Sequence, residues 1–108
     1  MQELLVDIED QDELYRSYMP FLKSGGIFIK TNTRFDMGAA VSLRIMLPDA
    51  LEEEEATGKV VWITPQGAQN SNPPGIGVSF DTEFELLNDK IVKLLGTALN
   101  HDKPTYTM

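Results

Sequence analysis

Few side chains in the sequence have the types and spacing that enzymatic chemistry requires. The single histidine, His101, lies in a C-terminal segment without hydrophobic periodicity. A Ser-His-Asp arrangement would therefore depend on a mobile residue, whereas catalysis needs a base held at a fixed distance from its nucleophile. Cysteine is absent, which removes thiolate metal sites and disulfides and fits a reducing compartment. The sequence predicts no catalytic residues and no enzyme.

Carboxylates are numerous, but their spacing does not suit a metal or cofactor site. The run 52–55 consists of four consecutive glutamates, which would point to different sides of any regular element and could not converge on one cation. Asp7 and Glu9 are expected at the surface of a strand end. The pair Gly25-Gly26 lacks the Lys-Ser/Thr that follows in a phosphate-binding loop. We therefore predict no metal site and no cofactor.

The composition is acidic, with 17 Asp and Glu residues against 9 Lys and Arg residues and a net charge of −8. This charge repels phosphate backbones and anionic lipid surfaces, so we expect no nucleic-acid partner. No apolar run approaches the roughly 20 residues of a membrane span, and the N-terminus lacks the basic start of a signal peptide. We expect a cytoplasmic protein without membrane insertion.

Hydrophobic periodicity predicts a mainly β fold that ends in one helix. Five segments have the apolar pattern of strands: 2–8, 26–31, 41–47, 57–64 and 75–80. The period then becomes helical, and we expect this helix to begin with a capping box of Thr82 and Glu85 and to end near Gly96. The pattern predicts a small antiparallel β-barrel of five to six strands with a C-terminal helix packed against it.

The length of the chain allows one domain with a modest core. We assign this domain, with its closing helix, to residues 1–98. Residues 99–108 are expected to form a flexible tail. The segment 14–20 is predicted to be a connection of undetermined local structure, in which any helical turn must end before Pro20.

Aromatic residues of the connection and of the fourth strand are candidates for contacts with other proteins. Tyr15 and Tyr18 offer large contact areas at low entropic cost, although both could instead pack under the rim of the barrel. In the strand 57–64, Val60 and Trp62 are expected on one face, and the opposite face is also apolar. Trp62 suits the core better than an interface, but a strand that is apolar on both faces keeps an interface open.

Prolines and the chain end supply the remaining candidates. Pro65 could contact a partner or could simply end the strand before it. Pro104, Tyr106 and Met108 could belong to an adhesive peptide that becomes ordered on binding, and the alternative is a solvated terminus without a role.

Several strings of the sequence resemble one family of small β-barrels. A glycine pair at 25–26 opens a strand, and the strings GKVVW at 58–62 and GIGVSF at 75–80 follow it, before a helix. This order is similar to the PilZ domain family over residues 2–98. Three further segments look like family members that act in type IV pilus biogenesis: 14–21, 64–69 and 103–108.

PilZ domains that bind cyclic di-GMP carry two arginines separated by three residues, followed by an Asp/Asn-x-Ser-x-x-Gly element. The arginines pair with phosphates and stack on guanine, while the Asp/Asn and Ser side chains hydrogen-bond a base edge or ribose. With Gly26 as the motif glycine, Phe21 takes the Asp/Asn position and Lys23 the Ser position. Arg16 has no second arginine at the required spacing. We therefore expect no cyclic di-GMP binding.

The resemblance implies a non-enzymatic adaptor or regulator of type IV pilus assembly and twitching motility. Pilus members of the family are associated with the pilus assembly ATPase (PilB-like). In some bacteria they are also associated with a regulator that carries a degenerate EAL domain (FimX-like), so nucleotide sensing would belong to the partner. The alternative is a cyclic di-GMP receptor with an atypical site.

Overall fold

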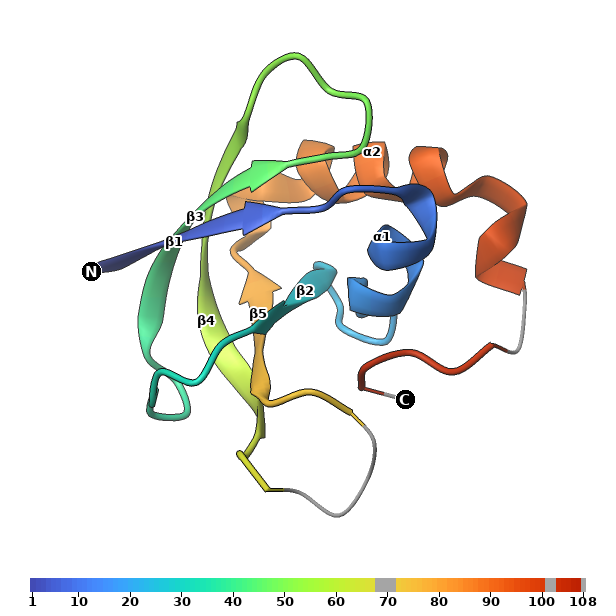
Figure 1. Cartoon of the computed structure of the whole chain (residues 1–108). Coiled ribbons are helices and arrows are strands. Elements are labelled where there is room, and N and C mark those ends of the chain that lie inside the picture. Colours follow the sequence, from blue (N-terminus) through green and yellow to red (C-terminus); the bar gives the residue numbers. More distant parts are fainter. Residues whose placement is uncertain (68–71, 101–102, 108) are drawn as a thin grey trace.

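The computed structural model describes residues 1–67, 72–100 and 103–107 (Figure 1). Strands, α-helices and 3-10 turns (η) follow one another along these residues. Their bounds are β1 Gln2–Asp7, α1 Gln11–Ser17, β2 Gly26–Lys30, β3 Ala40–Met46, β4 Glu54–Thr64, β5 Gly75–Phe80, η1 Thr82–Phe84, α2 Glu85–Leu95 and η2 Gly96–Asn100.

The five strands form one curled sheet in the order β1-β3-β4-β5-β2. Neighbouring strands are antiparallel except β1 and β3, which run parallel. Figure 1 shows the sheet curled into a half-barrel, with β1 and β2 at the front and α2 behind. The predicted mainly β fold with a C-terminal helix is confirmed, and the parallel β1–β3 pair is the one departure from antiparallel pairing among the described strands.

The inner face of the curled sheet carries the main core, here called the inner cluster. Its completely buried members include Leu14 of α1, Ile27 of β2 and Ile91 of α2. Helix α2 presents Leu87, Ile91 and Leu95 at a spacing of four residues, which places them on one helical face toward the sheet. The helical period of the sequence therefore identifies the face that closes the core.

The start of the C-terminal helix differs from the predicted capping box. Thr82–Phe84 form η1, α2 starts at Glu85, and neither element has a side-chain cap hydrogen bond. The carboxylate of Asp81, which precedes η1, instead accepts a hydrogen bond from Thr57 Oγ1 at 2.6 Å. The predicted end is correct, because Gly96 follows α2 with a φ of 52°, a conformation that favours glycine.

Helix α1 was not expected from the sequence. Its N-cap is Asp10, whose side chain accepts a hydrogen bond from the Glu13 N–H at 2.8 Å. The acidic run 9–13 interrupts the apolar pattern, yet an Asp followed three residues later by a Glu has the spacing of a helix N-terminus. The helix ends at Ser17, before Pro20, as expected.

A β-bulge in β4 changes the face that its apolar residues occupy. Val60 pairs with Val78 and Trp62 pairs with Gly77, so Val61 is the additional residue. Val60 lies in the inner cluster, whereas Trp62 packs on the other face of the sheet. The expectation that Val60 and Trp62 share a face is wrong, because the extra residue resets the alternation.

A second, smaller apolar cluster lies on the outer face of β2, β5 and β4. This outer cluster consists of Met19, Phe28 and Tyr106, with Leu22 and Trp62 packed against it. Glycine in β5 leaves the necessary space, because a Cβ at Gly77 would lie 2.7 Å from the Met19 sulfur and 2.8 Å from Trp62 Cβ. Residues from four separate parts of the chain meet here.

The C-terminal segment 103–107 lies against α1 and β2 (Figure 1). The Tyr106 N–H donates to the Arg16 carbonyl at 3.0 Å, and the Tyr106 side chain is only 9% exposed. The domain boundary at residue 98 and the mobility of residues 99–108 stay predictions. Within the described residues, however, η2 continues to Asn100 and Tyr106 belongs to the outer cluster.

Candidate protein-interaction surface

The turn that opens β2 is packed against helix α2. Gly25 has a φ of 74°, and a Cβ at this position would collide with the Asn88 side chain. The Asn88 Oδ1 atom accepts a hydrogen bond from the Tyr18 hydroxyl at 2.6 Å. The turn, the helix and the residue after α1 are thus fixed together, and the turn presents Phe21 and Lys23 at the surface.

Phe21 and Trp62 form an aromatic pair at the edge of the outer cluster. Their ring centres are 6.2 Å apart with an interplanar angle of 54°, a tilted arrangement that aromatic pairs favour. Phe21 is 46% exposed and Trp62 is half-buried. The Trp62 indole N–H donates to Thr64 Oγ1 at 3.0 Å, so its polar atom is satisfied within the chain. The pair therefore offers accessible apolar area without an unpaired indole N–H.

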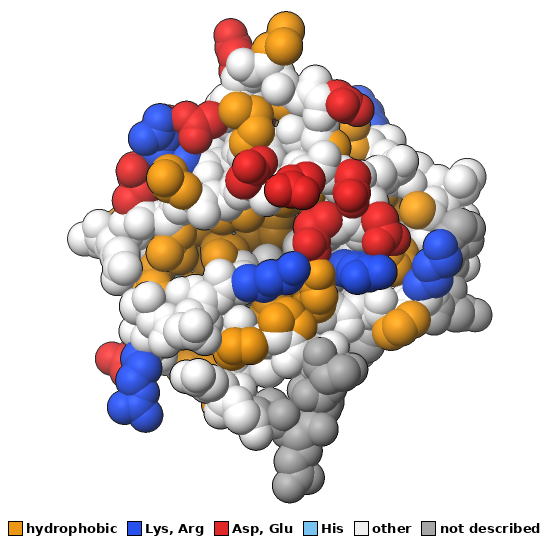
Figure 2. Space-filling model, in the orientation of Figure 1, with side chains coloured by type: hydrophobic (Ala, Val, Ile, Leu, Met, Phe, Trp, Pro, Cys, Tyr) orange, Lys and Arg blue, Asp and Glu red, His pale blue; other side chains and the backbone are white. Residues whose placement is uncertain are grey.

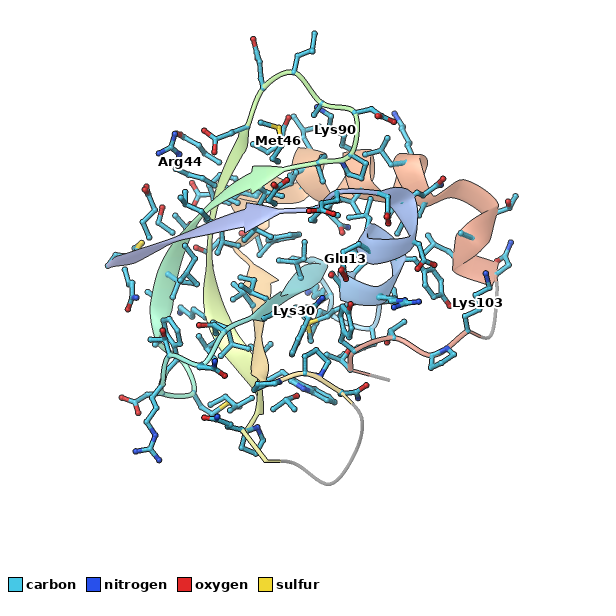
Figure 3. All side chains as sticks on the ribbon, in the orientation of Figure 1. Glu13, Lys30, Arg44, Met46, Lys90 and Lys103 are labelled. Atoms are coloured by element: carbon cyan, nitrogen blue, oxygen red, sulfur yellow. The ribbon has the colours of Figure 1, made fainter. Side chains whose placement is uncertain are left out.

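Tyr106 anchors the C-terminal segment beside this pair. Its hydroxyl donates to the Glu13 carboxylate, its ring centre lies 5.5 Å from that of Phe28, and Lys30 Nζ lies 4.9 Å from its ring centre. Lys30 also forms an ion pair with Glu13 at 3.1 Å, and Figure 3 shows the two side chains together. Hydrogen bonding to Tyr106 raises the pKa of Lys30 most, partial burial opposes this, and Glu13 adds to the increase.

Tyr15 holds the beginning of the same segment. Its hydroxyl donates to the Lys103 carbonyl at 2.9 Å, and its side chain is half-buried. A cleft of about 480 Å³ lies where α1 meets the segment, with Arg16 and its ion-pair partner Asp12 on the α1 side and Pro104 on the other. Helix α1 and the C-terminal segment thus form one continuous surface.

Four of the seven residues proposed from the sequence are in or beside the outer cluster and the segment that covers it: Tyr15, Trp62, Pro104 and Tyr106. Tyr18 lies elsewhere, because it is buried in the inner cluster with its hydroxyl on Asn88. Burial raises the pKa of Tyr18 above its ordinary value, although the hydrogen bond to Asn88 opposes this. Pro65 is exposed beyond the end of β4, and Met108 lies outside the described residues.

Sequence reasoning did not identify Met19, Phe28 and Phe21 as parts of this surface. Met19 and Phe28 are buried beneath it, and Phe21 is the exposed partner of Trp62. One signal was available for Phe21, since an aromatic residue stands at a position where the ligand-binding motif has Asp or Asn. No local pattern distinguishes Met19 and Phe28, because they meet only through tertiary packing.

The profile of the PilZ domain matches residues 3–96 of the chain, which include the β2 turn and all five strands except the first residue of β1. The chain belongs to the PilZ domain family. No curated protein matches the sequence. PilZ domains are generally non-enzymatic binding or adaptor domains, and membership links the chain to cyclic di-GMP-related adaptors and receptors.

In this PilZ domain, Phe21 and Lys23 stand at the Asp/Asn and Ser positions of the nucleotide-binding motif when Gly26 is taken as the motif glycine. Phe21 has no hydrogen-bonding group and contacts Trp62. Lys23 is exposed and can supply a charge, but it lacks the planar fork with which arginine holds a phosphate. The absence of cyclic di-GMP binding stays a prediction.

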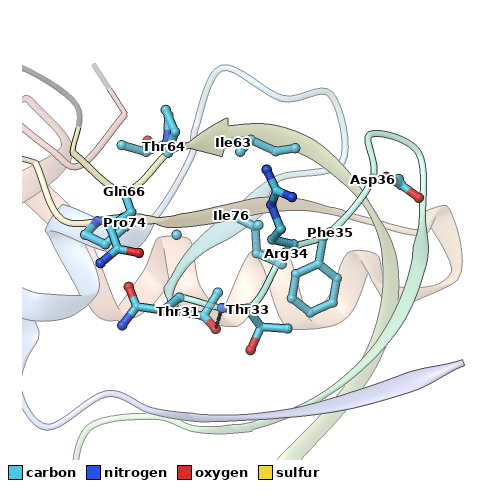
Figure 4. Close-up of a pocket in the computed structure, with 13 residues that line it drawn as sticks. Thr31, Thr33, Arg34, Phe35, Asp36, Ile63, Thr64, Gln66, Pro74 and Ile76 are labelled. Atoms are coloured by element: carbon cyan, nitrogen blue, oxygen red, sulfur yellow. Dashed lines mark hydrogen bonds between the residues drawn. The ribbon is translucent and has the colours of Figure 1, made fainter.

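A separate cleft of about 750 Å³ lies at one end of the half-barrel of this PilZ domain, between the connection 31–36 and the ends of β4 and β5 (Figure 4). Figure 4 shows Arg34 reaching between Ile63 and Phe35, with Gln66 on the opposite side. Arg34 has no ion pair with any residue that the structure describes. Pro65 lines this cleft and not the outer cluster.

Within residues 1–67, 72–100 and 103–107 of the PilZ domain, no group of three or more His, Cys, Asp or Glu side chains is placed to hold a metal ion. None of the helices there has the length and apolar character to cross a membrane.

Proposed function

We propose that this PilZ domain is a non-enzymatic adaptor or regulator of type IV pilus assembly and twitching motility that acts in the cytoplasm. It binds the pilus assembly ATPase and a regulator with a degenerate EAL domain, and it does not itself bind cyclic di-GMP. The observation that carries this proposal is the Phe21–Trp62 contact. Phe21, one ring of this pair, stands at the Asp/Asn position of the nucleotide-binding motif when Gly26 is taken as the motif glycine.

The chemistry of this surface favours a protein partner. Exposed aromatic rings that rest on a packed base give a large contact area at low entropic cost, and Trp and Tyr are frequent energetic centres of interfaces. Trp62 rests on the outer cluster and Phe21 packs against Trp62. Tyr15, which packs against the inner cluster, is joined to the C-terminal segment through its hydroxyl. The exposed Pro104 lies in the adjoining segment. These side chains offer apolar area but few hydrogen-bonding groups for a small polar ligand.

Capture of the purified assembly ATPase on the immobilised chain tests the partner. Trp62→Ala removes the central ring of the surface and is expected to weaken capture at least tenfold, as for an interface hot spot. Leu51→Ala is the matched control, because Leu51 is 99% exposed in the connection between β3 and β4 and should leave capture unchanged. Equal capture by wild type and a folded Trp62→Ala variant would count against the aromatic surface.

Titration calorimetry with cyclic di-GMP tests the second half of the proposal. We expect no binding heat, because Arg16 has no second arginine at the spacing that holds the phosphates, and Phe21 and Lys23 replace the Asp/Asn and Ser side chains that bind the base edge or ribose. A dissociation constant of about 1 µM or tighter would contradict this expectation.

A cyclic di-GMP receptor with an atypical site is the second candidate, and one observation favours it. Arg34 reaches into the 750 Å³ cleft without an ion-pair partner among the described residues, and a guanidinium is suited to phosphate. If calorimetry detects binding, Arg34→Ala should abolish it while Lys23→Ala should not. Binding that depends on Lys23 instead would place the nucleotide at the β2 turn.

A further inference from the structure

The two edges of the curled sheet differ in how they are covered. At the β2 edge, Tyr18 forms a β-bridge with Ile27, and the Met19 N–H donates to the Gly26 carbonyl at 3.0 Å. At the other end of the sheet order, β1 pairs only with β3 among the described residues. Strand β1 is therefore an open edge, and such edges can accept an additional strand.

The backbone groups that face this open edge can be identified. The Ile8 N–H donates to the Met46 carbonyl at 3.0 Å, which continues the β1–β3 ladder. Because the N–H and C=O groups of alternate residues in a strand point to the same side, the even-numbered residues of β1 face β3. The N–H and C=O groups of Glu3, Leu5 and Asp7 consequently point toward the open edge.

The open edge borders a hollow with an apolar floor. Figure 2 shows hydrophobic side chains on the floor of this hollow, between β1 and β2. Leu4 is half-buried against the inner cluster, and Val6 and Ile29 retain 9% and 7% exposure. A strand added to β1 would place alternate side chains over this floor, so its inward-facing residues should be apolar.

Charge on the outer face of β1 restricts the partner further. On this face of β1, Leu5 lies between Glu3 and Asp7, and it is 70% exposed. Asp7 has no ion pair with a described residue. Glu3 has a long contact with Arg44, at 3.7 Å. A partner strand matches Glu3, Leu5 and Asp7 when its outward-facing residues are basic, apolar and basic in that order. Opposite charges that face each other across two paired strands stabilise the pair.

A second copy of the chain does not meet this requirement. Two β1 strands related by a two-fold axis would pair antiparallel around Leu5, and Glu3 of one copy would face Asp7 of the other. Like charges directly opposite each other destabilise a strand pair. The charge pattern therefore favours a different, basic partner.

We propose that β1 is a docking edge for an extended segment of a partner protein. The segment has Lys or Arg at both ends and three apolar residues between them. Its first, third and fifth side chains face outward, next to the acidic residues and Leu5, and its second and fourth cover the hollow. Strand β1 and the Trp62 surface involve different residues, so this inference does not depend on the proposed pilus function.

The synthetic peptide acetyl-Gly-Lys-Val-Leu-Val-Lys-Gly-amide is a direct probe. Amide NMR shifts in the full chain are expected to change at Glu3, Leu5 and Asp7, and hydrogen exchange of these three amides should slow. The peptide with Glu in place of both Lys residues is the charge control and should bind at least fivefold more weakly. Equal affinity for the two peptides, or no shift changes in β1, would overturn the proposal.

Leu5→Pro tests the backbone contribution. Proline removes the Leu5 N–H that faces the open edge, and it leaves the β1–β3 hydrogen bonds in place. Affinity for the basic peptide should fall at least fivefold, whereas Leu5→Val should retain affinity. If Leu5→Pro does not fold, Asp7→Lys provides the test, because this change leaves one acidic and one basic residue on the outer face of β1 and should abolish the preference for the basic peptide.

Sedimentation distinguishes the partner from a second copy. The wild-type chain is expected to be a monomer at concentrations where it binds the peptide. A dimer that Leu5→Pro dissociates would overturn the proposal in favour of self-pairing. Failure of the peptide tests would leave the Trp62 capture experiment unaffected, so the two ideas can fail separately.

Discussion

The two apolar clusters lie on opposite faces of one sheet and differ in what closes them. Helix α2 closes the inner cluster with Leu87, Ile91 and Leu95, three side chains of one hydrogen-bonded element. The outer cluster is closed by Trp62 of β4, by residues of a turn and by Tyr106 of an extended segment. An extended segment can detach by breaking few contacts, whereas a helix leaves only with much of the core. We therefore propose that the inner cluster serves stability and the outer cluster serves recognition.

Ile91→Ala should have the largest effect on stability, because Ile91 is completely buried in the inner cluster. The free energy of unfolding is expected to fall by about 3–4 kcal/mol, the cost of a large-to-small change in a site that cannot collapse. Urea denaturation followed by circular dichroism measures this change. Leu86→Ala on the same helix is the control, because Leu86 is 83% exposed and should change stability by no more than about 0.5 kcal/mol.

Tyr106→Ala tests whether the outer cluster is held more loosely. Its ring contacts Phe28 and its hydroxyl binds Glu13. We expect the free energy of unfolding to fall by about 2 kcal/mol. This is less than the cost of truncating a buried aromatic residue in a rigid core, because the segment that carries Tyr106 can rearrange. Hydrogen exchange should accelerate at the backbone amide of residue 106, while the amides of α2 stay protected. A loss as large as that of Ile91→Ala would show that both clusters unfold as one unit.

Much of the fold followed from the sequence because its patterns are local. The alternation over 41–47 identified β3, and the four-residue spacing in α2 identified the helical face that covers the core. The parallel β1–β3 pair could not be predicted, since strand partners are chosen by contacts far apart in the chain. The bulge at Val61 also escaped prediction, because nothing in the alternation marks an inserted residue.

Less of the candidate protein-interaction surface than of the fold could be predicted from the sequence. Trp62 and Tyr106 were singled out as aromatic residues, but their proximity depends on the space above Gly77 and on Met19 beneath them. Tyr18 has the same residue type as Tyr15, yet tertiary packing buries it. Whether a tyrosine lies at a surface or in a core is decided by its neighbours in space, which single-residue reasoning cannot supply.

Trp62→Ala should separate recognition from stability. Trp62 is only half-buried and lies at the border of the outer cluster, so we expect a loss of about 1 kcal/mol in the free energy of unfolding. Capture of the assembly ATPase should nevertheless fall at least tenfold. Trp62→Phe retains a ring and should recover most of the stability. A stability loss above about 3 kcal/mol would mean that the indole is a core residue of the fold.

The smallest expected effect concerns the alkaline stability that Tyr18 contributes. Burial raises the pKa of Tyr18 in the folded state above its unfolded value, so the folded chain retains the phenol proton after the unfolded chain has begun to lose it. This contribution to stability is complete below the unfolded pKa, near pH 10, and is lost as the pH rises through the folded pKa.

Tyr18→Phe removes the titrating group but keeps the ring in the inner cluster. The free energy of unfolding of the wild-type chain should decrease with pH more steeply than that of Tyr18→Phe between about pH 9.5 and 11. Lys30 also loses a stabilising contribution at high pH, because its pKa is raised beside Tyr106. Because both proteins contain Lys30, its contribution cancels when the pH dependence of wild type is compared with that of Tyr18→Phe. Parallel slopes would show that the Tyr18 hydroxyl is as accessible to water as a surface tyrosine, and the inner cluster would then open at this point.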